Sequence, residues 1–206
     1  MTVDLVRKRV LETRNILRRT DTRDCKQCHG ATTVEERVRF MPMYRDFDLS
    51  GVSNPMDPAM TWDSLERLRE KTSMKVVVKG LMTPEDAAIE EGRGFDGMAV
   101  SNHGGRADES GFASIDAHPA ITEQVDGAIP VIVDSGFRRG SDIVKALCMG
   151  ADMVCVGRPY IWGLTAFGQA GVERVMQLLD AELQVTMQQM GVSRPADLTK
   201  DMIGTV

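Results

Sequence analysis

The chain has 206 residues, of which 42% are hydrophobic and 27% charged, a composition ordinary for a soluble globular protein with one sizeable core. Its formal net charge of −5 argues against nucleic acid as a partner, because a nucleic-acid-binding surface is basic. The chain has no apolar run of about eighteen residues, no secretory signal at its start and only four Cys. We therefore expect a cytoplasmic protein with no membrane partner and no disulfide framework.

Residues 1–73 differ from the rest of the chain, which repeats strand and helix, and are expected to form the first of three segments. Positions 5–20 are rich in Arg and Leu, as in a polar helix or loop, and positions 21–60 are expected to form a long, partly ordered excursion. Trp62, Leu65 and Leu68 recur at helical spacing, which predicts a helix within 61–72.

Residues 74–192 repeat a strand followed by a helix. Continuous apolar runs predict strands at 74–79, 95–101, 129–134 and 151–157. Thr83 as N-cap and Pro84 at the first helical position open the first helix of this segment. Further helices are expected at 115–125, 141–149 and 171–190, and residues 193–206 are expected to form a C-terminal tail.

Strands that alternate with helices predict a parallel sheet of the α/β class. Polar and glycine residues cluster where each strand ends, as in a (β/α)₈ barrel (TIM barrel), whose chemistry gathers at that rim. A doubly wound open sheet would show the same alternation, but no Gly-x-Gly-x-x-Gly follows the first strand. Because a complete barrel takes about 250 residues, four strand-helix units predict only one half of it.

The segment Ser101-Asn102-His103-Gly104-Gly105-Arg106 places an imidazole and a guanidinium in one loop at a strand end. Histidine suits proton transfer near neutral pH, and Arg binds a carboxylate through two parallel hydrogen bonds. This composition suits a loop that binds and deprotonates a small acid. The alternative is a histidine satisfied within a turn, beside a solvated arginine.

Two glycine-rich turns with arginines follow the last two strands, at 134–140 and 157–159. Barrels commonly hold a phosphate group at this place, with backbone N–H groups and a helix N-terminus. Arg138 and Arg158 would add positive charge to such a site, and Lys79, at the end of the first strand, would stabilise negative charge on a cofactor. The alternatives are two basic surface turns and a solvated lysine.

Taken together, six motifs resemble the FMN-dependent 2-hydroxy-acid oxidase and dehydrogenase family, which includes glycolate oxidase, lactate oxidase, lactate 2-monooxygenase, mandelate dehydrogenase and flavocytochrome b2. Their order and spacing match from about residue 61 to 190. The motifs are Val-Lys-Gly at 78–80, Ser-Asn-His-Gly-Gly-Arg at 101–106, Ala-Ser-Ile-Asp at 113–116, Asp-Ser-Gly-Phe-Arg-Arg-Gly at 134–140, Lys-Ala-Leu at 145–147 and Gly-Arg-Pro at 157–159.

The resemblance implies that a small, lactate-like 2-hydroxy acid is oxidised to a 2-oxo acid with FMN as cofactor. It implies His103 as the base that takes the substrate proton and Arg106 as the clamp on the substrate carboxylate. Lys79 would lie beside the flavin ring and favour its anionic reduced form. The residues implied to contact FMN are Lys79, Ser101, His103, Asp134, Gly136, Arg138, Gly157 and Arg158.

The N-terminus resembles the end of the family's fourth barrel strand. Asp4 is then the carboxylate that orients His103, and Arg9 is a second carboxylate-binding arginine, although its loop reads Arg7-Lys8-Arg9 where the family has glycine. The alternative for both is a frayed, solvated start. Ser135 is another departure, because relatives usually carry Gly there and left-handed geometry is less favourable for Ser.

If Asp4 ends the fourth strand, the chain holds strands five to eight, the C-terminal half of the barrel. We then expect weak FMN binding and little turnover by this chain alone, and either a complementary N-terminal half or a homo-oligomer as partner, because a half-barrel exposes strand edges. Two other functions stay open. One is a different phosphate-binding barrel, such as IMP dehydrogenase, and the other is a non-catalytic half that only associates with a partner.

Cys25-Lys26-Gln27-Cys28-His29 matches the attachment pattern of c-type haem. Covalent haem attachment needs export, for which the sequence shows no signal, and a zinc site would need a fourth ligand. Similar runs occur in the lactate-monooxygenase-like branch of the family that the chain resembles. We therefore expect a loop feature and no metal.

Overall fold

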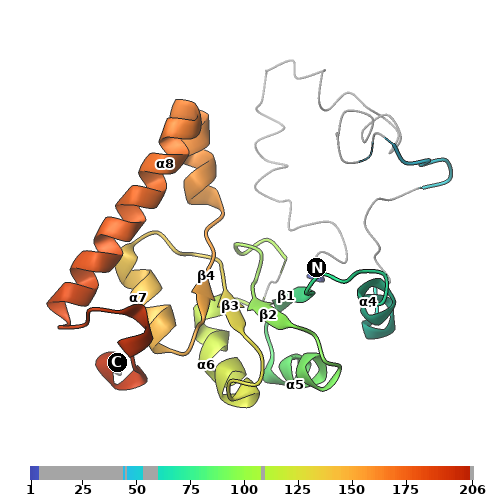
Figure 1. Ribbon diagram of the computed structural model, residues 1–206, viewed down its shortest axis with the longest axis horizontal. Coiled ribbons are helices and arrows are strands. Elements are labelled where there is room, and N and C mark those ends of the chain that lie inside the picture. Colours follow the sequence, from blue (N-terminus) through green and yellow to red (C-terminus); the bar gives the residue numbers. More distant parts are fainter. Residues whose placement is uncertain (5–43, 45, 53–59, 108–109, 205–206) are drawn as a thin grey trace. The chain divides into compact units, whose positions relative to one another are not determined.

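The computed structural model describes residues 1–4, 44, 46–52, 60–107 and 110–204. The chain divides into two compact units, one of Met1–Asp4 with Trp62–Val206 and the other of Leu5–Thr61. The first unit contains the sheet and the helices that Figure 1 labels. In the second unit, Phe47 donates its backbone N–H to the Tyr44 carbonyl at 3.2 Å and so closes a turn.

Four parallel strands form the sheet of the first unit, in the order β1-β2-β3-β4 (Figure 1). This order has no reversal, whereas a doubly wound sheet reverses its strand order at a switch point, so the strands follow the barrel arrangement. The strands are β1 Val77–Leu81, β2 Gly97–Val100, β3 Val131–Val133 and β4 Met153–Val154. The connecting helices are α5 Pro84–Gly92, α6 Ser114–Val125 and α7 Gly140–Cys148.

The predicted strand-helix units are all present, with strands shorter than expected at one or both ends. Thr83 caps α5 as predicted, because its side chain accepts the Asp86 backbone N–H at 3.2 Å. β1 extends to Leu81, beyond the predicted end at Lys79, and its register against β2 shifts between those two residues. Gly80, with φ +111°, allows this irregularity.

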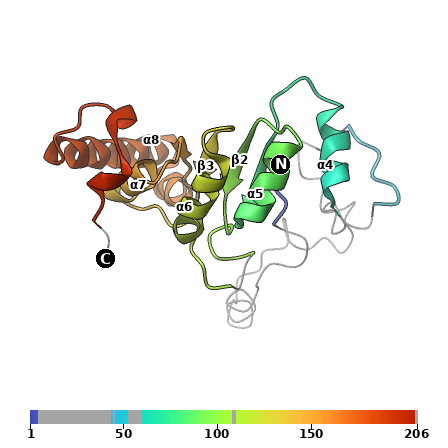
Figure 2. The ribbon, with the colours of Figure 1, turned by 90° about the horizontal axis from the view of Figure 1, so that it is seen from below.

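One face of the sheet packs against the helices. Val78, Met98, Val100 and Val133 are completely buried, and they alternate along their strands with less buried residues. Figure 2 shows α5 and α6 side by side along the sheet. Burial of these aliphatic side chains provides the main driving force for this layer, at about 1.5–3 kcal/mol for each fully buried side chain.

The opposite face carries the row Lys79, Ala99, Ile132 and Met153, which lie in register across the four strands. This row is less well covered than the helix side, since Met153 is 55% exposed. In a closed barrel, side chains of this face fill the interior. The sheet therefore has the strand order and the helix-covered outer face of part of a barrel wall, with the row from Lys79 to Met153 on the inner side.

The N-terminal residues extend the sheet beyond β1. Thr2 forms a parallel bridge with Lys79, the Val3 N–H donates to the Lys79 carbonyl at 2.8 Å, and the Lys79 N–H donates to the Met1 carbonyl at 2.6 Å. A preceding barrel strand would make the same pairing. Asp4 thereby stands next to the end of β1.

The C-terminal region differs most from expectation. The helix α8 spans Arg158–Gln189 but has non-helical dihedral angles at Phe167 and Gly168, so the predicted helix at 171–190 is its second part, and its first part was not predicted. Turns of 3₁₀ helix follow at Pro195–Asp197 and Lys200–Met202, after which the described tail ends. The buried cluster beneath α8 consists of Val144, Cys148, Met187, Val192 and Leu198.

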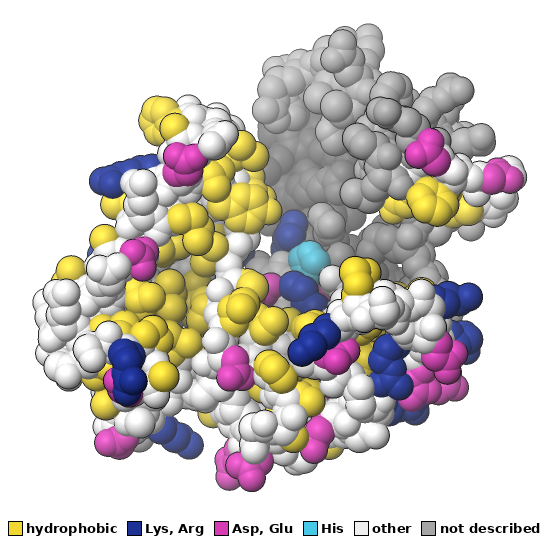
Figure 3. All heavy atoms as spheres, in the orientation of Figure 1, with side chains coloured by type: hydrophobic (Ala, Val, Ile, Leu, Met, Phe, Trp, Pro, Cys, Tyr) yellow, Lys and Arg dark blue, Asp and Glu magenta, His cyan; other side chains and the backbone are white. Residues whose placement is uncertain are grey.

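The first part of α8 presents apolar side chains to solvent. Ile161, Trp162, Leu164 and Phe167 are 45%, 55%, 51% and 78% exposed, and Figure 3 shows hydrophobic side chains gathered over this helix.

Before the sheet, the helix predicted within 61–72 is present as α4, Trp62–Arg69, with Leu65 buried. In the part of the chain that the structure describes, no helix has the length and apolarity that crossing a membrane requires.

Candidate active site

A pocket of about 280 Å³ lies where the strands of the first unit end. Its wall includes the ends of β1 and β3, the loop after β2 and the turn between β4 and α8. Chemistry at the C-terminal ends of parallel strands is the rule in barrels. The charged and titratable side chains in this wall are Lys79, His103, Arg106, Asp134, Cys155, Arg138, Arg158 and Tyr160.

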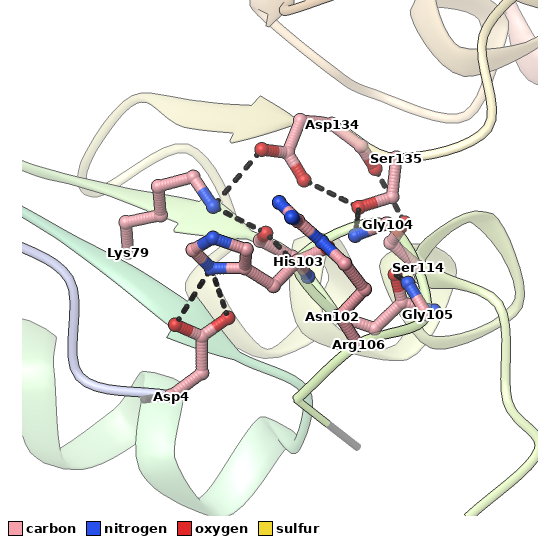
Figure 4. Close-up of polar contacts among 11 residues, drawn as sticks. Asp4, Lys79, Asn102, His103, Gly104, Gly105, Arg106, Ser114, Asp134 and Ser135 are labelled. Carbon is pink, nitrogen blue, oxygen red and sulfur yellow. Dashed lines mark hydrogen bonds and ion pairs between the residues drawn. The ribbon is translucent and has the colours of Figure 1, made fainter. Parts of the chain in front are cut away.

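Asp4 and His103 form the most informative contact (Figure 4). His103 Nδ1 lies 3.2 Å and 3.3 Å from the two carboxylate oxygens of Asp4. The His103 side chain is 17% exposed and that of Asp4 is 8% exposed. An ionised carboxylate only accepts hydrogen bonds, so Nδ1 carries the proton and Nε2 is left as the basic nitrogen.

Gly80 makes room for this contact. A Cβ added at Gly80 would lie 2.6 Å from Asp4 Cβ and 2.9 Å from the Asp4 backbone nitrogen. A side chain at this position would therefore displace Asp4 from His103.

The loop after β2 holds its catalytic candidates by internal hydrogen bonds. His103 has φ +57°, an uncommon left-handed conformation for a residue with a side chain, of the kind that clusters at functional sites. Its backbone N–H donates to the buried Ser101 hydroxyl at 3.1 Å, and its carbonyl accepts Arg106 Nε at 3.1 Å. Asn102 Oδ1 accepts the Gly105 N–H at 2.9 Å, which closes the turn.

Lys79 joins this loop to the end of β3. Its Nζ donates to Ser101 Oγ at 2.6 Å and lies 3.0 Å from Asp134 Oδ2. The Lys79 and Asp134 side chains are 29% and 18% exposed. A half-buried ammonium thus faces the pocket beside the loop that carries His103.

The opposite wall of the pocket has the features of an anion site. Gly157 is the N-cap of α8, whose first backbone N–H groups carry partial positive charge. Gly136 has φ +92°, and a Cβ built there would meet nothing within 4 Å, so the turn leaves open space. Two glycines beside a helix N-terminus and two arginines fit a phosphate group.

Both arginines of this wall have defined partners. Arg158 Nη2 donates to the Gly104 carbonyl at 2.8 Å, which links the anion site to the His103 loop. Arg138 lies over the ring of Trp162, with 5.0 Å between its guanidinium carbon and the ring centroid. The structure therefore brings the predicted residues of three separate loops into one site.

Sequence reasoning gave no role in the site to several side chains that line this pocket, among them Ser135 and Cys155. Ser135 has φ +77°, and its hydroxyl accepts the Gly104 N–H at 2.9 Å. Desolvation by the surrounding pocket wall and the Asp134 carboxylate raise the pKa of the Cys155 thiol, although its side chain is exposed. Two sequence signals could have indicated these residues. Ser135 stands where relatives usually carry Gly, and alternation along β4 places Cys155 on the same face as Met153.

Arg9 and the Cys25-Lys26-Gln27-Cys28-His29 motif lie outside the described residues. Within the described ranges, no group of three or more His, Cys, Asp or Glu side chains is arranged to hold a metal ion.

The fold and the site together define a class of protein: part of a parallel α/β barrel wall, with a histidine paired to a carboxylate and a pocket lined by glycines and arginines at the carboxyl ends of its strands. Residues 1–205 match the family model described as FMN-dependent dehydrogenase, and the chain belongs to this family of FMN-dependent oxidoreductases. Its architecture is accordingly part of a (β/α)₈ barrel, and FMN is the cofactor of the family.

Curated relatives match the chain over most of its length. It is 42% identical over 152 residues to a 2-hydroxyacid oxidase of Dictyostelium discoideum, which covers 74% of this chain and 39% of that protein. It is 46% identical over 143 residues to an L-lactate oxidase of Nostoc sp., which covers 69% of this chain and 39% of that protein. The chain thus spans about two fifths of the length of these relatives.

A solved structure covers nearly the whole chain. It is a soluble mutant of the membrane-associated (S)-mandelate dehydrogenase from Pseudomonas putida, with a TM-score of 0.79 and 32% sequence identity. The match covers 98% of this chain and 55% of that one. A chimera of (S)-mandelate dehydrogenase matches with a TM-score of 0.68 and 40% identity, over 71% of this chain and 41% of that one.

Proposed function

We propose that this chain carries the proton-abstracting and FMN-binding half of an oxidoreductase that converts a small, lactate-like 2-hydroxy acid into the 2-oxo acid. The observation that carries the proposal is the placement of His103. Its Nδ1 faces Asp4 at 3.2 Å, while the ring lines a pocket shared with Arg106 and Arg158. Oxidation of a carboxylate substrate by a phosphorylated flavin needs such a base between a carboxylate clamp and a phosphate site.

His103 takes a proton from the substrate at Nε2, because Nδ1 is engaged by Asp4. The Asp4 carboxylate holds the ring in this tautomer and stabilises the imidazolium that forms. Bound FMN supplies the acceptor for the two electrons of the oxidation. In a hydride route, Nε2 takes the 2-hydroxyl proton and the C2 hydrogen leaves with its electron pair. In a carbanion route, Nε2 takes the C2 proton, and the 2-hydroxyl proton is lost as the electron pair leaves C2. Both routes use the same base.

Arg106 binds the substrate carboxylate. Its Nε donates to the His103 carbonyl at 3.1 Å, which ties the guanidinium to the residue that carries the base. Planar, bidentate pairing with a carboxylate would then orient the 2-hydroxyl group toward Nε2. We assign Arg9 as a second clamp by the same chemistry, although it lies outside the described residues.

The cofactor contacts follow from the two walls of the pocket. The turns at 136–138 and 157–158 would hold the FMN phosphate, and Lys79 would place positive charge beside the flavin ring. The side chains of Ser101 and Asp134 would supply hydrogen-bonding groups between the phosphate site and the flavin ring, since both lie next to Lys79 Nζ. The residues that we propose to contact FMN are Lys79, Ser101, His103, Asp134, Gly136, Arg138, Gly157 and Arg158.

The remaining strands of the barrel would complete the site. We propose that residues 1–73 end the fourth strand and form an excursion, that 74–192 form the FMN-binding half-barrel, and that 193–206 form a tail. A complementary N-terminal half or a homo-oligomer would cover the inner face of the sheet. Turnover by this chain alone would be low, and its proposed location is the cytoplasm.

A second candidate function is non-catalytic association with a partner. It is favoured by the apolar side chains on the first part of α8, where Trp162 and Phe167 are 55% and 78% exposed. An exposed apolar surface of this kind is typical of interaction sites.

One experiment separates these functions. The purified chain is loaded with FMN, mixed anaerobically with L-lactate and followed at the flavin absorption band. Bleaching of a retained flavin supports oxidation of the acid. A flavin that is retained but not bleached by lactate or by other 2-hydroxy acids supports a different phosphate-binding barrel or a site that needs the remaining strands. A chain that retains no flavin supports the non-catalytic function.

A further inference from the structure

Ser135 occupies a backbone conformation that normally belongs to glycine. Its φ of +77° lies in the left-handed region, where the Cβ of a serine crowds the neighbouring carbonyl. The side chain is half-buried at the end of β3, between the pocket and the loop after β2. A disfavoured backbone conformation persists only where surrounding interactions hold it in place.

The Ser135 hydroxyl makes two hydrogen bonds (Figure 4). It accepts the Gly104 backbone N–H at 2.9 Å and donates to Asp134 Oδ1 at 2.7 Å. A hydroxyl both donates and accepts, so one side chain serves a backbone donor and a carboxylate acceptor at once. Glycine at this position would relieve the backbone but would leave both partners without these bonds.

These two bonds close a ring of polar contacts around the base. Asp134 Oδ2 lies 3.0 Å from Lys79 Nζ, Lys79 donates to Ser101 Oγ at 2.6 Å, and Ser101 Oγ accepts the His103 N–H at 3.1 Å. The peptide between His103 and the next residue is the last link. The ring consists of Ser135, Asp134, Lys79, Ser101, His103 and Gly104.

Both backbone polar groups of Gly104 are hydrogen-bonded to side chains of the pocket wall. Its N–H donates to Ser135, and its carbonyl accepts Arg158 Nη2 at 2.8 Å. Loss of the serine hydroxyl would leave Arg158 as the contact from the phosphate side, while His103 would stay tied to Ser101 and Asp4. The turn that carries the imidazole would then be less restricted.

We propose that Ser135 is a positioning residue for the base, which acts by holding the Gly104 peptide so that His103 Nε2 keeps its place over the pocket. The inference rests on the proposed function, because it assigns His103 as the base. Catalytic groups must be held within a fraction of an ångström of the productive geometry, so a small gain in freedom lowers the rate of the chemical step. Substrate and cofactor affinity depend on other side chains and would change little.

The test compares Ser135→Gly and Ser135→Ala with the unaltered chain. Both variants lose the hydroxyl, but only the glycine variant also relieves the backbone. The matched control is Asp126→Gly, which relieves a left-handed residue with φ +46° at the exposed C-cap of α6, away from the pocket. Amide hydrogen exchange of Gly104 is measured by NMR, with the amides of β2 and β3 as internal references.

We expect Gly104 to exchange about tenfold faster in both Ser135 variants, the order expected for losing one hydrogen bond, while the reference amides and the control stay unchanged. In the loaded chain we expect the limiting rate constant of anaerobic bleaching at saturating acid to fall about tenfold. The acid concentration that gives half of this rate, and the Kd for FMN, should stay within about twofold. Unchanged exchange of Gly104, or equal acceleration of the reference amides, would overturn the inference.

The two proposals fail in different ways. A wild-type chain that does not bleach flavin counts against the proposed function, and the inference is then decided by Gly104 exchange together with the low-field Nδ1 proton signal of His103. Loss or broadening of that signal in both Ser135 variants, but not in Asp126→Gly, supports positioning of the imidazole. A sharp, unshifted signal contradicts it.

Discussion

The carboxylate of Asp4 and the imidazole of His103 lie 3.2 Å apart, although 99 positions separate them in the sequence. They meet because the Met1–Asp4 segment pairs with β1, while the loop after β2 turns back over the same rim of the sheet. Neighbouring parallel strands bring their carboxyl ends together. The pair is thus a product of strand order rather than of local sequence.

The first prediction concerns Asp4→Asn. An amide can donate to Nδ1 and so favours the tautomer whose Nε2 carries the proton, which removes the base while keeping the shape. We expect the rate of anaerobic flavin bleaching by a 2-hydroxy acid to fall by about 10²–10⁴-fold. The control Asp126→Asn, at the exposed C-cap of α6, should bleach at the wild-type rate. Equal rates for Asp4→Asn and wild type would show that Asp4 does not orient the base.

Gly80→Ala tests whether the space beside Asp4 matters. The added Cβ would meet Asp4 atoms at 2.6–2.9 Å and push the carboxylate away from His103. We expect a bleaching rate at least about tenfold lower and loss of the low-field Nδ1 proton signal. Gly127→Ala is the matched control, since it has φ +77° but nothing within 4 Å of an added Cβ. Both substitutions place alanine at a positive φ and should each cost about 1–2 kcal/mol of stability. If Gly80→Ala leaves the bleaching rate and the Nδ1 proton signal unchanged, as Gly127→Ala should, then the added Cβ does not displace Asp4.

Arg158→Ala tests the anion site. Loss of a guanidinium from a phosphate site should weaken FMN binding by about ten- to hundredfold. Riboflavin, which lacks the phosphate, should bind the variant and the wild type with nearly the same Kd. Arg174→Ala, on the exposed surface of α8, is the control and should leave both affinities unchanged. A similar loss for both ligands would place Arg158 near the flavin ring instead of the phosphate.

Glu90 should make the protein less stable as pH rises. The side chain is completely buried, with Oε1 accepting the Val78 N–H at 3.3 Å and Oε2 without a partner among the described residues. Burial raises the pKa of Glu90 from 4.5 to about 8. Between these values the unfolded chain releases the proton while the folded chain retains it, so the free energy of unfolding falls as pH increases from about 4.5 to 8.

The variant Glu90→Gln has no group to titrate at this position. Urea denaturation at pH 5 and pH 8 should show a smaller loss of stability for Glu90→Gln than for wild type, by on the order of a few kcal/mol. The control Glu123→Gln, on the exposed side of α6, should follow the wild type. Parallel pH curves for Glu90→Gln and wild type would mean that Glu90 ionises normally in the folded chain.

His118 should have the opposite effect on the acid side. The ring is completely buried in α6, and its nitrogens make no hydrogen bond of good geometry to the described residues, although the Ala146 carbonyl favours the charged form. Burial lowers the pKa of His118 from 6.5 to about 4. The stability that neutral His118 contributes is therefore fully present above about pH 6.5 and is lost as pH falls toward 4.

His118→Leu removes this group and fills a similar volume. We expect its urea midpoint to fall less than that of wild type between pH 6.5 and 4, with the largest difference at the acid end. Gln124→Leu, at an exposed position of the same helix, is the control and should keep the acid limb of the wild-type stability curve. A wild-type acid limb in His118→Leu would mean that the buried ring is not its source.

Local signals were sufficient for most of the elements. Aliphatic runs predict β1 to β3 because side chains buried on both faces of a parallel sheet leave no polar alternation, and Thr83 with Pro84 marks the start of α5 by capping chemistry within one turn. The first part of α8 was missed because its start at Arg158 was interpreted only as a phosphate-binding turn, and the non-helical residues Phe167 and Gly168 separate it from the predicted helix. Most strand ends were predicted too far out, whereas β1 continues to Leu81, past its predicted end, since hydrogen-bond pairing with a neighbour decides where a strand stops.

The sequence by itself determined the alternation of strands and helices, the family motifs and the identity of the candidate base, clamp and anion-binding residues, because each depends on residues close together in the chain. Only the tertiary structure decided that Asp4 reaches His103, that Arg158 and Ser135 hold the two sides of Gly104, and that Glu90 and His118 are buried without full hydrogen bonding. These contacts join separate strands and loops, and their distances depend on the register and packing of the sheet, which no local pattern of residues specifies.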